Sequence, residues 1–175
     1  NYNDVQVLKK KDIMVAILEH TKPHLECEYG SPWAKLVKKE VIKRNNILFP
    51  VGIKKSQDRI FMLQLVEDSS NMIYTSSYTY VYRDDNVTSI CNKYNPEIDT
   101  ILYDALNEID IFLSKNKLNE ELKNSRDIAV INFLFIIMKL KIFNLNNKEK
   151  LIKKINELEN ICFKFGVYDI LNRNL

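Results

Sequence analysis

The chain of 175 residues suffices for one domain or two small ones, and its 46% hydrophobic and 28% charged content is ordinary for a folded protein. It has only three glycines, so neither a glycine-rich phosphate loop nor a long flexible linker is expected. The net charge is +3, with basic residues in excess over 1–60 and 116–175 and acidic residues in excess over 61–115. This alternation differs from the one-sided basic surface of a dedicated nucleic-acid-binding protein.

The cysteines and the apolar stretches bear on the compartment. Cys27, Cys91 and Cys162 are odd in number and far apart, whereas a disulfide framework uses paired cysteines at short spacings. We therefore expect an intracellular location, cytoplasmic or nuclear. A membrane-spanning helix needs about 20 apolar residues. The most apolar stretch, 125–143, is interrupted by Asn132 and Lys139, so no membrane span is expected.

Two short helices are predicted near the N-terminus. The first runs over 12–19 and ends before Pro23, whose ring cannot continue a helix. The second is predicted over 31–46, because Ser31 is a favoured N-cap and Pro32 occupies the first helical position.

The predicted 31–46 helix has an apolar side and a basic side. Helical spacing places Trp33, Leu36, Val37 and Val41 toward the core. The basic side comprises Lys35, Lys38, Lys39, Lys43 and Arg44. The last four are expected in solvent, because lysine is almost never fully buried without a partner.

A small antiparallel sheet of about three strands is predicted next. After Pro50 the spacing of apolar residues changes from about 3.6 to 2, which indicates strands. Residues 59–67 and 72–83 are rich in β-branched and aromatic residues and are joined by turn-forming residues, as in a hairpin. Residues 47–55 are predicted as an edge strand, where Pro50 is tolerated. On the last strand the tyrosines that lie mostly on one face are Tyr74, Tyr78, Tyr80 and Tyr82.

Three longer helices are predicted in the C-terminal part. An apolar stripe from Ile98 to Leu113 indicates the first, 125–143 reads as a central buried helix, and 146–166 ends at Gly166. We therefore predict an α+β fold with two short N-terminal helices, the small sheet and a C-terminal bundle of three helices. A single domain over 1–175 is expected, with 1–91 and 95–175 as alternative sub-units.

One cluster has metal-ligand chemistry. His20, His24 and Cys27 fall close together and could begin a zinc site that Cys91 would have to complete. The spacing matches no compact zinc motif, so we expect two partly exposed histidines and a buried cysteine. No metal or other cofactor is predicted.

Catalytic groups are sparse. The chain has two histidines, both near residue 20, and contains no P-loop, G-x-G-x-x-G or H-E-x-x-H motif. We predict a non-catalytic protein-interaction or assembly module rather than an enzyme. Tyrosine suits interfaces because it offers a large area with a polar tip. The predicted interface is therefore Tyr74, Tyr78, Tyr80 and Tyr82.

The alternative is a nucleic-acid-binding module that uses the basic helix 31–46 and the lysines at 54–55. Lysine and arginine neutralise phosphates, but such contacts carry no sequence information. No sufficient helix precedes 31–46 to complete a helix-turn-helix, so binding is expected to be weak and indifferent to sequence. The predicted contacts are Lys35, Lys38, Lys39, Lys43, Arg44, Lys54 and Lys55.

Overall fold

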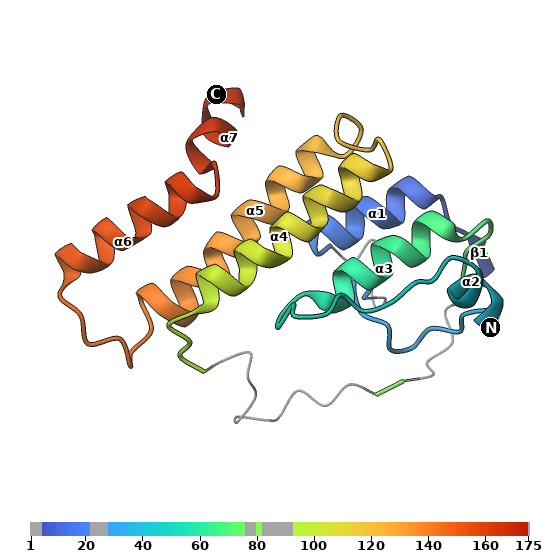
Figure 1. Cartoon of the computed structure of the whole chain (residues 1–175), viewed down its shortest axis with the longest axis horizontal. Helices are drawn as coiled ribbons and strands as arrows, with labels where there is room; N and C mark the ends of the chain where they lie inside the picture. The colour runs from blue at the N-terminus through green and yellow to red at the C-terminus, as the bar shows by residue number, and fades with distance from the viewer. Residues whose placement is uncertain (1–4, 22–27, 76–79, 82–92, 175) are drawn as a thin grey trace.

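The structure is a computed structural model that describes residues 5–21, 28–75, 80–81 and 93–174 (Figure 1). The described residues form seven α-helices, one π-helical turn and one two-stranded antiparallel sheet, so the fold is mixed α+β and mostly helical. The helices are α1 (Lys10–Glu19), α2 (Lys39–Arg44), α3 (Gln57–Asp68), α4 (Ile98–Lys115), α5 (Lys123–Ile137), the π-helical turn η2 (Met138–Ile142), α6 (Leu151–Lys164) and α7 (Val167–Asn174). The strands are β1 (Val5–Val7) and β2 (Ile73–Thr75).

Four helices close into a ring around the core. α1 packs on α3 and α5, α3 packs on α4, and α4 packs on α5 (Figure 1). Each contributes side chains that are almost completely buried, among them Ile17, Leu63, Ile109 and Phe133. One continuous cluster of buried apolar residues contains side chains from all four helices and from α6 and α7. The core therefore draws on both the 1–91 and the 95–175 parts of the chain.

The strand predicted over 59–67 is wrong, because this segment lies within helix α3. Its side chains are buried on nearly every side, from Arg59 to Leu63 and again at Leu65 and Val66. A helix that is buried all round has apolar residues at every spacing, so its pattern also matches a short strand. α3 packs between α1 and α4, and this tertiary packing favours the helix over the strand.

The predicted three-stranded sheet is a two-stranded ribbon. Residues 47–55 form a loop with a turn at 51–52 rather than an edge strand, and within 72–83 only β2 is a described strand. Its partner is β1, with Val5 opposite Thr75 and Val7 opposite Ile73. β1 was not predicted, because three residues are too few for a clear alternation.

The helix predicted over 31–46 is confined to α2. Ala34 has φ +56, a left-handed conformation that interrupts a helix, and Lys38 is extended. The predicted inward side chains are not a core stripe: Trp33 and Val41 are half-buried and Leu36 is fully exposed. The correct part of the prediction is the end of the helix at Asn45 and Asn46.

The C-terminal helices are present, but they do not form a separate three-helix bundle. α4 and α5 belong to the four-helix ring, whereas α6 packs on η2 and α7. α5 is not buried all round, since Phe135 is largely exposed. α6 begins at Leu151 rather than at residue 146, and Gly166 ends it with φ +68, the left-handed conformation predicted for a stop.

Two phenylalanines of α5 test this packing. Phe133 is 0% exposed in the ring core and Phe135 is 63% exposed on the same helix. We expect Phe133→Ala to lower the free energy of unfolding by about 3–5 kcal/mol, because it removes buried apolar area and leaves a cavity. The matched change Phe135→Ala is expected to alter it by about 0.5 kcal/mol or less. Denaturant unfolding followed by circular dichroism measures both, and equal losses would contradict the described packing.

Candidate functional site

The basic side chains predicted for the 31–46 helix, which we name the α2 row, do not all lie in solvent. Lys38, Lys39, Lys43 and Arg44 are exposed on and beside α2, as predicted, and none of them forms an ion pair with a described residue. Lys35 is half-buried instead. Its Nζ donates a hydrogen bond to the backbone oxygen of Glu28 and lies 5.7 Å from the centre of the Trp33 ring. The exposed row is thus reduced to four side chains.

The two lysines after α2 do not extend that row equally. Lys54 is exposed, and its Nζ lies 3.9 Å from Glu97 Oε2. Both side chains are more than two-thirds exposed, so this pair adds little stability. Lys55 is half-buried. Lys54 thus has an acidic neighbour and Lys55 is less exposed than the four side chains on and beside α2.

The predicted tyrosine face is described at two of its four positions. Tyr74 is half-buried on β2, opposite Gln6 of β1. Tyr80 is exposed and stacks on Trp33, with ring centroids 5.0 Å apart. Tyr78 and Tyr82 lie outside the described residues.

The opposite side of the ribbon carries an apolar surface that was not predicted. Val5, Val7 and Ile73 share one side of the two strands, because side chains of paired positions and alternate residues point the same way. All three are exposed, Val7 by 77%. We name this surface the ribbon face. The alternation Val-Gln-Val was its only signal in the sequence.

The predicted zinc ligands are only partly described. The His20 side chain is mostly exposed and its Nδ1 lies 3.7 Å from Glu28 Oε1. His24, Cys27 and Cys91 lie outside the described residues. Among the residues that the structure does describe, no group of three potential metal ligands gathers.

Arg59 of α3 is a buried cation without an ion pair among the described residues. The residue is 8% exposed, and its Nη1 is buried without a hydrogen-bond partner. The guanidinium carbon lies 5.2 Å from the centre of the Phe133 ring. Burial lowers the pKa of Arg59 to about 10, and the negative charge of Glu28 opposes this effect only in part. Arg59 therefore costs the fold a desolvation penalty that is weakly compensated.

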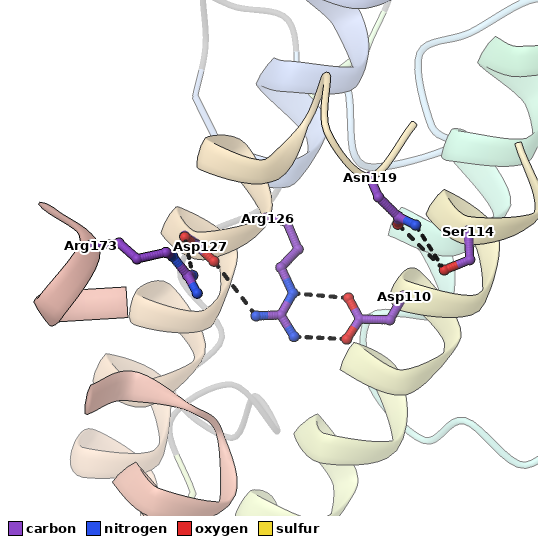
Figure 2. Close-up of polar contacts among 6 residues, drawn as sticks. All are labelled: Asp110, Ser114, Asn119, Arg126, Asp127 and Arg173. Atoms are coloured by element: carbon purple, nitrogen blue, oxygen red, sulfur yellow. Dashed lines mark hydrogen bonds and ion pairs between the residues drawn. The ribbon is translucent and has the colours of Figure 1, made fainter. Parts of the chain in front are cut away.

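Arg126 has the opposite environment (Figure 2). Its Nε and Nη2 donate to the two carboxylate oxygens of Asp110 at 2.9 and 2.7 Å. Its Nη1 lies 3.7 Å from Asp127, whose other oxygen accepts a hydrogen bond from Arg173 at 2.7 Å. The hydrogen bond with Asp110 raises the pKa of Arg126 despite partial burial. The network ties α4, α5 and α7 together.

A cleft of about 260 Å³ lies beside this network, between α4 and the α6–α7 corner. Its wall contains Tyr103 and Lys164, whose Nζ lies 4.1 Å from the ring centre, and Asp169. Arg126 and Arg173 are already neutralised by carboxylates. Neither arginine therefore offers a free charge to a ligand in the cleft, and we assign the network a structural role.

A second apolar surface lies at the start of α6. Residues 143–155, which we name the 143–155 segment, include the loop after η2 and the first turn of α6. Five large apolar side chains in it are exposed: Phe143, Leu145, Leu151, Ile152 and Ile155. Later along the same helix the apolar side chains are more enclosed: Leu158 and Cys162 are half-buried, and Phe165 after its end is buried.

The comparisons with known proteins add no family to this description. No family model matches the chain, and no curated protein or solved structure is similar to it. No helix in the described part of the chain is long and apolar enough to cross a membrane.

The two arginines predict opposite effects of the same substitution. We expect Arg59→Met to keep or raise stability, by about 1 kcal/mol, because it removes a buried and weakly compensated charge. We expect Arg126→Met to lower stability by about 3 kcal/mol, because it leaves Asp110 without its cation and the buried Asp127 with Arg173 as its only cation. Chemical unfolding at neutral pH measures both. A loss of several kcal/mol in Arg59→Met would show that this charge has a strong partner.

Proposed function

We propose that the protein is a non-catalytic interaction module that binds a protein partner through the ribbon face. The observation that carries the proposal is the exposure of Val5, Val7 and Ile73 on one side of a two-stranded ribbon. A ribbon of two strands is marginally stable alone. Apolar side chains that face water do not stabilise the ribbon. A partner that covers them removes their apolar area from water, which favours binding.

Aromatic side chains among the described residues support this use. The predicted interface residue Tyr74 lies on the same ribbon, and Tyr80 and Trp33 form a stacked aromatic pair that is partly open to solvent. Aromatic residues are enriched in protein interfaces. The intracellular location is part of the proposal and rests on the odd number and wide spacing of the cysteines.

The test replaces the three aliphatic side chains by threonine, which retains strand propensity. Affinity capture with the wild-type chain identifies bound proteins, and titration of the purified partner measures the dissociation constant. We expect Val5→Thr/Val7→Thr/Ile73→Thr to weaken binding on the order of 100-fold, because the partner then buries less apolar area.

The matched control is Ile111→Thr/Ile128→Thr, which changes exposed aliphatic residues of α4 and α5. It is expected to leave the affinity unchanged. If every captured protein binds the ribbon variant as tightly as the wild type, the proposed surface is wrong.

A second candidate function, nucleic-acid binding, is favoured by the four exposed cations of the α2 row. We expect weak binding to duplex DNA, with dissociation constants of roughly 10⁻⁴ to 10⁻⁶ M at physiological salt and no sequence preference. Lys38→Gln/Lys39→Gln/Lys43→Gln should reduce the slope of log K against log salt by about 0.9 for each phosphate that the variant no longer neutralises. Titration of random DNA at several salt concentrations measures the slope, and an unchanged slope would exclude the row as a DNA-binding surface.

A further inference from the structure

The 143–155 segment lies at the end of the long axis away from β1 and α2 (Figure 1). It combines exposed apolar side chains with exposed cations. Leu145 is 89% exposed, and Leu151 and Ile152 of the first turn of α6 are also largely exposed. The same residues include four lysines against the single acid Glu149. Such a combination needs an occupant that accepts both apolar groups and positive charge.

The lysines flank the apolar side chains. Successive helical residues are rotated by about 100°, so Leu151, Ile152 and Ile155 fall in one sector of α6. Lys153 and Lys154 fall on its two sides. Lys148 and Lys150 precede the helix and line an open hollow of about 470 Å³ with Tyr94, Asn147, Glu149 and Lys153. Lys153 pairs with Glu149 at 3.1 Å, but both side chains are exposed and the pair is weak.

The backbone of this segment is held in place by hydrogen bonds. Buried Asn147 donates to the backbone oxygens of Lys141 and Ile142 at 3.0 and 3.3 Å, and its Oδ1 accepts from the backbone N–H of Glu149 at 3.0 Å. Lys141 in turn pairs with Asp99 of α4 at 2.7 Å and with Glu157 of α6 at 2.8 Å. The exposed apolar side chains therefore lie on a loop and a helix start whose backbone is fixed by these contacts.

A second copy of the chain fits this surface poorly. Glu159 lies between Ile155 and Phe163 along the exposed side of α6, because residues four apart share a helix face. Antiparallel pairing of two α6 helices about a two-fold axis near their middle would bring the two Glu159 carboxylates close together. Leu145, the most exposed residue of the segment, lies in the loop outside any such pairing.

We propose that the 143–155 segment docks the protein on an anionic lipid surface, as a peripheral contact that does not span the bilayer. Leu145, Leu151 and Ile152 enter the boundary between headgroups and acyl chains, while the flanking lysines contact anionic headgroups. This division of apolar and basic residues is the one that interfacial helices use. The surface is separate from the ribbon face, so the inference does not depend on the proposed protein partner.

The test is flotation of the full chain with phosphatidylcholine vesicles that contain or lack phosphatidylserine, at low and at physiological ionic strength. We expect binding only to the vesicles with phosphatidylserine, and weaker binding as salt rises. Lys148→Gln/Lys150→Gln/Lys153→Gln is expected to lower the partition coefficient on the order of 100-fold, from the roughly fivefold contribution of each lysine. Leu145→Ser/Ile152→Ser is expected to lower it by a similar factor.

Two controls match these variants at positions away from the segment. Lys115→Gln/Lys117→Gln/Lys123→Gln makes the same change of net charge where α4 ends and α5 begins, and Ile111→Ser/Ile128→Ser removes exposed aliphatic residues of α4 and α5. Both are expected to bind as the wild type does, and circular dichroism verifies the fold of every variant.

Four results would overturn the proposal. They are no binding to phosphatidylserine vesicles, equal binding to both vesicle types, equal loss in the controls, or binding of RNA or an acidic protein through the same lysines without vesicle binding.

Discussion

Closure of the four-helix ring is the constraint on which the rest of the structure depends. It leaves α3 with almost no side in contact with water, so every residue of its middle turns must be apolar or be compensated inside the core. Arg59 is the one charged residue among the buried side chains of α3, and its lowered pKa reflects the cost of burying that charge. Arg126 lies on α5 between two carboxylates, Asp110 of α4 and Asp127 of α5 itself, so the same type of side chain stabilises that corner.

The extent to which the fold was predictable follows from this closure. α4 has one apolar side and one polar side, and α1 is bounded by charged residues before it and by Pro23 after it, so their predicted and observed spans agree closely. Gly166 ends α6 as its backbone freedom suggests. The segment of α3 was predicted as a strand, because a helix that is buried on all sides shows no helical periodicity of apolar residues. The contacts that stabilise it as a helix come from α1 and α4, which are distant in sequence. The 31–46 segment begins with residues that favour a helix start, yet its backbone is not helical before Lys39. In this non-helical part Trp33 stacks on Tyr80 and Lys35 donates to the backbone of Glu28.

The candidate site residues also include some that the sequence predicts and others that it does not. The exposure of Lys38, Lys39 and Lys43 was predictable, because the cost of burying an ammonium group applies in any fold. The ribbon face was not, because β1 and β2 are each three residues long and lie far apart in the chain. Apolar residues of α6 were visible in the sequence, but nothing in their pattern predicted that they would be exposed. Their exposure is a property of the tertiary arrangement, in which α6 packs on η2 and α7 rather than into the ring.

The position of the two apolar surfaces has a further consequence. The ribbon face and the 143–155 segment lie toward opposite ends of the long axis, with the ring between them (Figure 1). α4 alone, with 18 residues, spans about 27 Å of this body. A ligand bound at one end would therefore not contact the surface at the other end, and it would stabilise the folded chain by mass action. Coupling between the two surfaces would require the ring to change its arrangement or its mobility, so a coupling free energy near zero is the signature of a rigid spacer.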